Sequence, residues 1–588
     1  MRKNYGFGYT PSPYQEKVFD FVLHGEGNGV IKAVAGSGKT STIVSAMQLV
    51  PKNKKCLFIA FNKSIVQELE ERLKGYSNCA IKTIHSLGYS IVRRNLGANI
   101  ALDEYKYTSL VKNNIGELTS LDISEKKMPR RELLTYVNSI IKLIDFARFN
   151  CAQSAREIRR VADTYGIPVM YDECDIVEKC LNWGKEHTET VDYTDMVWLP
   201  YELSLRPFGN QYDWIFADEV QDFSKMAVEL FFRCFKRGTR FVAVGDTDQS
   251  INMFAGSSQD AFERLCNYPN TEMFSLPVTY RCAKRIVDFV KRFSPMMVPR
   301  DDAPNGKIIY DCGISNLQVG DMVLARSRTP LFKLYAKLLK MGVPSYMKGQ
   351  DYGRELIAMI DAVDPNVTKI GRDLLHDGLF IRLYDDMLEE RNALMRKRGL
   401  DMRDATLSDY IMSIYDSINA IIALSATCVT RSDLVKRIES MFDEENNGIC
   451  LSTIHKAKGL EADNVYILCN SSMPSSLATK EWEIEQERNL QYVAYTRPKN
   501  VLAFVSEKII SPSASLLAPE SILEDVRNIE MCVCRVLGKT PAEDIPAVEF
   551  SRFIATNMAD VSVNHGENGA KWEKRKDADK SILDDLIE

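Results

Sequence analysis

One stretch decides the fold of this chain: Ala33-Val34-Ala35-Gly36-Ser37-Gly38-Lys39-Thr40. It follows the short apolar run Val30-Ile31 and precedes a helical pattern that starts at Ser41. A strand, a glycine-rich turn ending in Lys-Thr and a helix form a phosphate loop, whose backbone N–H groups close around a phosphate. Ala33 replaces the glycine of the pattern but is also small. We therefore predict a nucleotide site, with Lys39 on the β- and γ-phosphates and the Thr40 hydroxyl on Mg²⁺.

Length and composition indicate a large soluble globular protein with several domains. The chain has 588 residues, too many for one hydrophobic core, and 45% of them are hydrophobic. A net charge of -5 gives no overall nucleic-acid signature, so any DNA or RNA site must be a local basic groove. The 14 cysteines form no Cys-x-x-Cys pair, which favours reduced thiols. Without a recognisable signal core or membrane-spanning segment, we expect a cytoplasmic protein.

Hydrophobic periodicity predicts an α/β core that is interrupted by a helical insertion. Short apolar runs alternate with helical patterns over residues 1–97 and again over 206–275, which is typical of a parallel α/β unit. The residues between them, 98–205, show helical periodicity with mixed charge and no clear strand runs. We therefore expect one nucleotide-binding core with a helical insertion.

The second half of the chain repeats this organisation. A second α/β core is expected over residues 276–355 and 449–545, with a smaller helical insertion over 356–448. Residues 546–588 form a polar tail, which we expect to be flexible, and the sequence leaves open whether this tail binds a protein partner. The sequence thus predicts two α/β cores, each with its own helical insertion.

Acidic turns follow two of the expected strands in the first core. Asp218-Glu219-Val220-Gln221-Asp222 comes directly after the apolar run 214–217, and Gly245-Asp246-Thr247-Asp248-Gln249-Ser250 follows the run 241–244. At the carboxyl end of a strand beside a phosphate loop, Asp218 can hold Mg²⁺ and Glu219 can activate a water. A neutral amide such as Gln249 can sense the γ-phosphate or orient the attacking water. Either turn alone could be ordinary surface, and only the nearby phosphate loop favours a catalytic interpretation.

Two arginines stand in settings that suit contact with a transferring phosphate. Arg281 ends the stretch Leu276-Pro277-Val278-Thr279-Tyr280-Arg281, and Arg497 ends Gln491-Tyr492-Val493-Ala494-Tyr495-Thr496-Arg497. An arginine can stabilise the charge on the equatorial oxygens of that phosphate. Since the chain has 75 Lys and Arg, most of them solvated surface charges, only context distinguishes these two.

These motifs belong to an ordered set that runs from about residue 14 to 505. The others are Tyr14-Gln15, Ala60-Phe61-Asn62-Lys63-Ser64, Thr83-Ile84-His85-Ser86 and Thr453-Ile454-His455-Lys456-Ala457-Lys458-Gly459-Leu460-Glu461. The set resembles the UvrD/Rep/PcrA-type superfamily 1 DNA helicases, and especially their phage and F-box DNA helicase branch. The resemblance implies an α/β fold with two RecA-like, parallel-sheet P-loop cores in tandem.

The resemblance also implies roles for individual residues. Gln15 would read the adenine edge, and Tyr280 would stack on the base. The residues expected to contact ATP are Gln15, Ala35, Gly36, Ser37, Gly38, Lys39, Thr40, Ser41, Tyr280, Gly459 and Glu461. Mg²⁺ would be held by Thr40 and Asp218, and catalysis would fall to Lys39, Asp218, Glu219, Gln249, Arg281 and Arg497. The expected contacts with single-stranded DNA are Phe61, Asn62, Thr83, His85, Phe254, Arg326 and His455.

Some positions depart from the family pattern. Ser41 stands where several members have an arginine that stacks on the base. Asn252 and Ala255 replace the usual Tyr and Arg, which removes a stacking surface and a charge from the expected DNA track. The insertion at 356–448 is also much shorter than that of the best-known members. These differences concern the grip on adenine, the grip on DNA and the regulation of unwinding.

The resemblance implies an ATP-dependent helicase that moves 3′→5′ on single-stranded DNA and unwinds duplex, using Mg-ATP in a cleft between the cores. Its partners would be single strands and single–double-strand junctions, without a membrane, in the cytoplasm of a prokaryotic or phage-infected cell, near the nucleoid. One alternative is a translocase that displaces bound proteins with little strand separation. Another is a nucleotide-gated DNA-binding module without turnover, against which the intact Asp218-Glu219 pair argues. An RNA strand remains open, because stacking and phosphate contacts tolerate either polymer.

Overall fold

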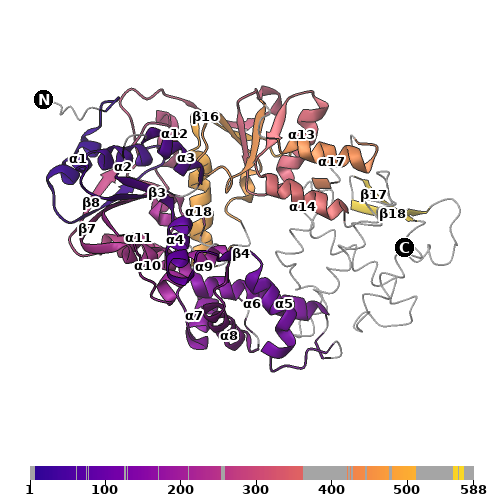
Figure 1. Ribbon diagram of the computed structural model, residues 1–588. Coiled ribbons are helices and arrows are strands. Elements are labelled where there is room, and N and C mark those ends of the chain that lie inside the picture. Colours follow the sequence, from indigo (N-terminus) through magenta and orange to yellow (C-terminus); the bar gives the residue numbers. More distant parts are fainter. Residues whose placement is uncertain are drawn as a thin grey trace. The chain divides into compact units, whose positions relative to one another are not determined.

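The computed structural model consists of two compact units. One contains residues 1–306 and 477–496, and the other contains 307–476 and 497–588 (Figure 1). The structure describes residues 7–60, 63–73, 76, 78–124, 127–128, 130–167, 169, 171–209, 211–252, 259–361, 417, 420–421, 424, 428–443, 447–475, 478, 480–510, 561–566 and 569–574. Within these residues, no helix combines the length and apolar character needed to cross a membrane.

A six-stranded parallel sheet forms the centre of the first unit. Its order is β3-β2-β6-β7-β1-β8. The strands are β1 (Asn28–Ala33), β2 (Cys56–Ala60), β3 (Cys79–Thr83), β6 (Tyr212–Ala217), β7 (Phe235–Gly245) and β8 (Thr271–Leu276). Strand β2 is buried at every residue, as expected for a sheet covered on both faces.

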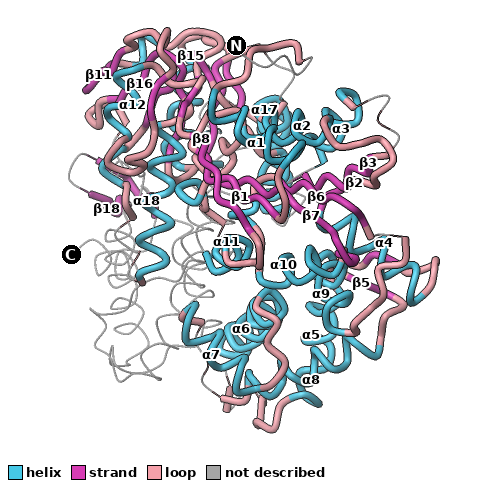
Figure 2. The backbone as a smooth tube through the Cα atoms, turned by 90° about the vertical axis from the view of Figure 1, so that its left-hand side faces the viewer, coloured by secondary structure: helices cyan, strands magenta, loops and turns pink. Residues whose placement is uncertain are grey.

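Helices cover both faces of this sheet, because successive side chains of a strand point to opposite sides. Ile31 packs with helices α1 (Pro13–His24), α2 (Lys39–Gln48) and α3 (Lys63–Arg72). Its neighbour Val30 belongs to the opposite layer. Figure 2 shows α1, α2 and α3 on one side of the strands and the second layer on the other. That layer contains α4 (Ile84–Leu96), α9 (Tyr193–Glu202), α10 (Lys225–Arg233) and α11 (Gln259–Cys266).

The insertion between β3 and β6 is mainly helical, as the periodicity of residues 98–205 indicates. It contains α5 (Lys106–Leu118), α6 (Arg130–Phe149), α7 (Ala155–Tyr165), α8 (Glu173–Glu186) and a short parallel pair, β4 (Ala101–Leu102) with β5 (Thr190–Val191). Its core is continuous with the second layer of the sheet, since Val111, Ile140 and Ile176 share one buried cluster with Leu87 and Leu230.

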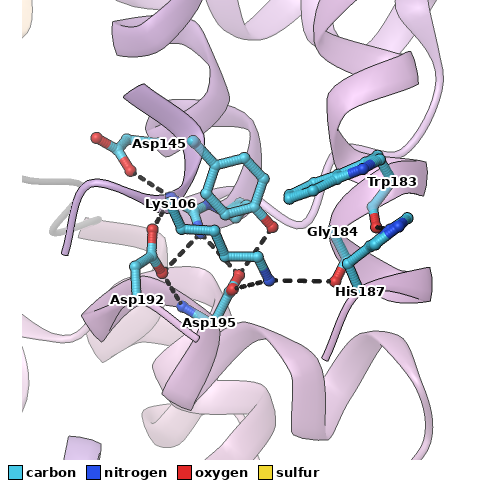
Figure 3. Close-up of polar contacts among 9 residues, drawn as sticks. Lys106, Asp145, Trp183, Gly184, His187, Asp192 and Asp195 are labelled. Atoms are coloured by element: carbon cyan, nitrogen blue, oxygen red, sulfur yellow. Dashed lines mark hydrogen bonds and ion pairs between the residues drawn. The ribbon is translucent and has the colours of Figure 1, made fainter. Parts of the chain in front are cut away.

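A buried ionic cluster joins α5, α6 and α9 within the first unit (Figure 3). The Arg148 side chain is 1% exposed and donates to Asp192 and Asp195 at 2.8 Å and to Asp145 at 2.7 Å. Lys106 forms an ion pair with Asp195 at 2.8 Å. Burial is the largest effect on the pKa of Asp195, which it raises. The cluster places two cations among three carboxylates, so that each charge has an opposite partner.

The close packing of α4 on α9 predicts that Gly88→Ala strongly destabilises the protein. A Cβ at Gly88 would overlap the backbone carbonyl oxygen of Met196 in α9, and backbone cannot move aside as a flexible side chain can. We expect a loss of about 2–3 kcal/mol in unfolding free energy, from overpacking, measured by chemical denaturation.

Gly116→Ala is the matched control for that prediction. Gly116 also lies in a helix, α5, but its Cβ would meet Ile123 Cδ1 at 3.7 Å, an ordinary van der Waals distance. Because alanine favours helices over glycine by about 1 kcal/mol, this variant should be unchanged or slightly more stable. Equal stability of the two variants would show that α4 and α9 are less closely packed than the structure indicates.

The second unit contains another six-stranded parallel sheet, with the order β11-β16-β15-β12-β14-β13. The strands are β11 (Lys307–Cys312), β12 (Met322–Ala325), β13 (Ser345–Met347), β14 (Ile449–Thr453), β15 (Ala462–Ile467) and β16 (Pro498–Val505). Leu331 of α13 (Thr329–Lys340), Leu356 of α14 (Gln350–Asp361) and Leu434 of α17 (Arg431–Met441) pack with them. The prediction of two parallel α/β cores in tandem is confirmed.

The compact units do not divide the chain where the sequence suggests. Residues 276–306, which were expected in the second core, lie in the first unit with β9 (Val278–Thr279), β10 (Val298–Pro299) and α12 (Lys284–Val290). Helix α18 (Glu481–Tyr495) also belongs to the first unit. Most of the 356–448 insertion lies outside the described residues. Within the polar tail, β17 (Val561–Gly566) pairs antiparallel with β18 (Gly569–Lys574).

Candidate nucleotide site

The phosphate loop joins the end of β1 to the start of α2. Gly36 and Gly38 have φ values of 69° and 75°, in the left-handed region that favours glycine. A Cβ at Gly36 would also lie 2.6 Å from Arg281 Cβ. The Ser37 hydroxyl is buried and has no hydrogen-bond partner among the described residues. A glycine-lined loop with an unsatisfied buried hydroxyl at a helix N-terminus fits a phosphate.

The basic and acidic residues predicted to act on the phosphate do come together. Lys39 Nζ lies 3.4 Å from Glu219 Oε1, and the Thr40 hydroxyl donates to Asp218 Oδ2. Asp218 is fully buried, and burial, with the neighbouring Glu219, raises its pKa to about 7. A hydroxyl and a buried carboxylate in contact are suitable oxygen ligands for Mg²⁺. Mg²⁺ bound by one or two such groups commonly takes its remaining ligands from water and phosphate oxygens.

Gln221 links the two acidic turns. Its amide nitrogen donates to Glu219, and its amide oxygen accepts from the backbone N–H of Asp246 at 3.0 Å. Gln249 Nε2 in turn donates to Asp246 Oδ2 at 2.6 Å. Burial raises the pKa of Asp246 to about 7. Because β6 and β7 are neighbours in the sheet, the turns that follow them form one hydrogen-bond network. The sequence analysis gave Gln221 no role in this network.

Tyr280 and Arg281 lie directly beside the phosphate loop. The backbone N–H of Tyr280 donates to the Gly36 carbonyl at 2.8 Å, and Arg281 Nη1 donates to the Thr496 carbonyl at 3.3 Å. The Tyr280 residue is 43% exposed, which leaves its ring accessible for stacking on a base. Both predicted residues are therefore close to the loop.

Gln15 is also close to the loop, but its amide is already engaged. Its oxygen accepts from the Ser12 backbone N–H at 2.9 Å, and its nitrogen donates to the Thr42 hydroxyl at 2.9 Å. In this arrangement Gln15 caps α1 and supports α2. Ser41, at the start of α2, is exposed.

The remaining predicted nucleotide residues gather around one loop of the second unit. Arg497 is buried and donates to the Leu460 carbonyl at 3.1 Å. Glu461 forms an ion pair with Lys499 at 3.0 Å, and Gly459 has a left-handed φ of 87°. The sequence analysis assigned Arg497, Glu461 and Gly459 to one nucleotide site, and all three lie at this loop of the second unit.

The described candidates for DNA contact occupy the ends of strands. Thr83 ends β3, and its hydroxyl accepts from the Ser86 backbone N–H at 3.1 Å, so it caps α4. His85 is exposed on the first turn of that helix. Arg326 and His455 follow the neighbouring strands β12 and β14 of the second unit, with Ala325 aligned to Thr453. The other candidates, Phe61, Asn62 and Phe254, lie outside the described residues.

Sequence reasoning assigned no role to two residues of α18 that contact this site. The Tyr492 hydroxyl accepts from the backbone N–H of Ala35 at 3.1 Å. Asn489 Nδ2 donates to the Ser250 carbonyl at 2.9 Å, beside Gln249. Asn489 and Tyr492 are three residues apart, so both lie on one face of α18. This spacing is the feature of the sequence that could have indicated a shared role.

Comparisons with known proteins match two segments of the chain to one family of helicases. Residues 14–268 match the family described as UvrD/REP helicase N-terminal domain, and residues 358–508 match UvrD-like helicase C-terminal domain.

Three curated relatives show how much of each chain is shared. The F-box DNA helicase protein 1 of Schizosaccharomyces pombe is 24% identical over 513 residues, which cover 80% of this chain and 55% of that protein. The ATP-dependent DNA helicase PcrA of Bacillus subtilis is 26% identical over 45% of this chain and 36% of its own. The ATP-dependent DNA helicase Rep of Salmonella typhimurium is 21% identical over 87% of this chain and 92% of its own. The chain thus spans about half or less of the first two relatives and nearly all of the third.

Proposed function

The chain belongs to the UvrD-like helicase family, and on that premise we propose that it hydrolyses ATP to move along DNA and separate its strands. The observation that supports this most is the convergence of Lys39, Thr40, Asp218 and Glu219 on one phosphate loop. A protein that only binds the nucleotide, without hydrolysing it, would not need a carboxylate such as Glu219 beside Lys39.

The proposed hydrolysis uses the side chains in the positions where they lie. The loop N–H groups and Lys39 would hold the phosphates, while Thr40 and Asp218 would hold Mg²⁺, which offsets negative charge on the phosphates. Glu219, 3.4 Å from Lys39, would accept the proton of the attacking water. Gln249, fixed by its bond to Asp246, would orient that water. The roles that the resemblance gives Arg281 and Arg497 on the γ-phosphate stay predictions.

We propose that the motor moves 3′→5′ on single-stranded DNA, with Thr83 and His85 of the first unit and Arg326 and His455 of the second among its contacts. Support comes from family membership and from the positions of these residues at strand ends. Histidine rings and arginine planes can stack on any base, which suits movement without sequence preference.

The direction of movement can be tested with duplexes that carry a single-stranded tail. With ATP and Mg²⁺, we expect the protein to unwind a 3′-tailed duplex and to leave a 5′-tailed duplex of the same sequence largely intact. A blunt duplex controls for unwinding without loading. Preference for the 5′ tail would overturn the proposed direction while leaving the ATPase assignment standing.

One observation favours a second candidate, a translocase that removes bound proteins and unwinds little. Asn252 replaces an aromatic residue of the family pattern, so this position has no ring for base stacking, and its amide donates to Asp222 at 3.2 Å. Weaker stacking would reduce grip during strand separation. Displacement of streptavidin from biotinylated single strands, without unwinding of the 3′-tailed duplex, would select this candidate.

A further inference from the structure

One face of α18 contacts several separate parts of the candidate nucleotide site. Asn489 and Tyr492 lie three residues apart in this helix, and Thr496 follows at its carboxyl end. Through them α18 reaches the turn after β7, the phosphate loop and Arg281, respectively. Asn489 also donates to the Thr247 carbonyl, at 3.4 Å. These contacts hold both sides of Gln249.

Tyr492 fixes the first half of the phosphate loop. Its side chain is fully buried, and burial raises the pKa of its hydroxyl well above the ordinary value, so the hydroxyl stays protonated. It accepts from the Ala35 N–H, while the Gly36 carbonyl accepts from the Tyr280 N–H. Consecutive residues of the loop are thus held by α18 and by the residue that follows β9. Within the same loop, the Ser37 N–H donates to the Val34 carbonyl at 3.3 Å.

The other end of α18 packs against the helical insertion. The Trp482 ring meets the Tyr165 ring edge to face, with centroids 5.9 Å apart, and Tyr165 is the last residue of α7. The Lys480 side chain fills the space beside Gly166, the cap of the same helix. At 1.5 Å per residue, the 15 residues of α18 span about 22 Å. A single helix therefore extends from the insertion to the phosphate loop.

We propose that Tyr492 and Asn489 are positioning residues for ATP hydrolysis, and that the insertion supports them by anchoring α18 through Trp482 and Tyr165. The inference rests on the proposed ATPase function. It adds that the loop is not shaped by its own sequence alone. Helix α18, more than four hundred residues further along the chain, also holds the loop in its conformation. The insertion contacts the amino-terminal end of this helix.

The first test is Tyr492→Phe, which keeps the ring and removes only the hydroxyl. We expect kcat for DNA-stimulated ATP hydrolysis to fall about tenfold, because a loosened loop misplaces the reacting phosphate, while KM for ATP changes much less. ADP binding at one molecule per chain, measured by calorimetry, would show that the lower kcat does not come from unfolded protein. If this variant does not fold, Asn489→Ser provides the same test at the other contact.

Tyr352→Phe is the matched control. Tyr352 is also buried, in the second unit, and its hydroxyl shares a hydrogen bond with Ser417 at 2.9 Å. This variant loses one buried hydroxyl of the same kind from the unit that does not contain the phosphate loop, so its kcat should equal that of the unchanged protein. An equal fall in both variants would mean that general loosening, and not positioning, explains the effect.

The second test concerns the anchor. Trp482→Ala and Tyr165→Ala should each lower kcat about threefold, since each loses an aromatic pair. The exposed Ile484, on the same helix and 51% exposed, supplies the control Ile484→Ala, which should have no effect. In combination with Tyr492→Phe, Trp482→Ala should add little, because both act through one helix.

The outcomes separate this inference from the proposed function. If the unchanged protein shows no DNA-stimulated ATP turnover, the proposed function fails. If it turns over ATP and Tyr492→Phe behaves like Tyr352→Phe, the positioning role fails while the function stands. If the Trp482→Ala and Tyr492→Phe effects multiply independently, α18 does not connect the insertion to the loop.

Discussion

Lys39→Ala is expected to abolish DNA-stimulated ATP hydrolysis. Lys39 is buried beside Glu219 at the start of α2, where its ammonium group can neutralise charge that develops on the transferring phosphate. Loss of one such preorganised contact costs about 10²–10³-fold in kcat, and in the proposed function Lys39 would also hold the ground-state phosphates. Phosphate release by the purified variant, at saturating single-stranded DNA and ATP, is the measurement.

Lys32→Ala is the control for that result. Lys32 lies on β1 only seven residues earlier, but its side chain is exposed, so turnover should be unchanged. Normal turnover in Lys39→Ala would refute its assignment to the phosphates. No turnover in the unchanged protein would instead favour the nucleotide-gated binding module over the motor.

Arg148→Met is expected to give the largest loss of stability. Arg148 is the cation shared by Asp145, Asp192 and Asp195 in the ionic cluster of Figure 3, and its guanidinium group also lies over the Tyr107 ring, at 4.1 Å. Without it, buried carboxylates lose their main counter-charge. Removing one partner of a buried ion pair costs about 3–5 kcal/mol. Hydrogen exchange of α5 and α6, together with thermal unfolding, would measure the loss.

The loss should depend on pH in a defined direction. Burial raises the pKa of Asp195 while Arg148 opposes that shift, so the pKa rises further in the variant. When the pKa of a carboxyl group is higher in the folded state than in the unfolded state, stability falls as pH rises above the pKa of the unfolded state. The reason is that the unfolded chain loses its proton more readily than the folded protein does. The variant should therefore lose more stability at pH 8 than at pH 5.

Arg159→Met is the matched control on the same insertion. The Arg159 side chain is 52% exposed and lies 3.8 Å from Asp163, so its removal should cost well below about 1 kcal/mol. If Arg148→Met cost no more than this, the cluster would be structurally dispensable. Arg148→Lys, which keeps the charge but loses the planar fork, should fall between the two.

Local patterns in the sequence were sufficient to predict the residues around the phosphate loop. The loop follows one strand and the acidic turns follow two others, and parallel strands bring such ends to one edge of the sheet. Lys39, Thr40, Asp218, Glu219 and Gln249 meet for that reason. The α/β character of both cores was likewise predictable from strand and helix periodicity.

Long-range contacts were not predictable in the same way. The bond between Ala35 and Tyr492 joins residues 457 positions apart, and no local pattern specifies that pairing. The occupied amide of Gln15 depends on Thr42 in another helix. The place of α18 in the first unit depends on packing with η2 (Thr247–Gln249) and α12, which neither its charge nor its periodicity reveals.

The continuous core beneath the first sheet has a consequence for how such proteins are dissected and exchanged. Val111 and Ile140 of the insertion belong to the same buried cluster as Leu87 and Leu230 of the sheet layer. Residues 98–205 are therefore not a detachable module. Grafting this segment from a relative transplants half of an interface, and the receiving α4, α9 and α10 would have to be exchanged with it. A change of side-chain volume in the core of the insertion should therefore be felt in the sheet layer that it contacts.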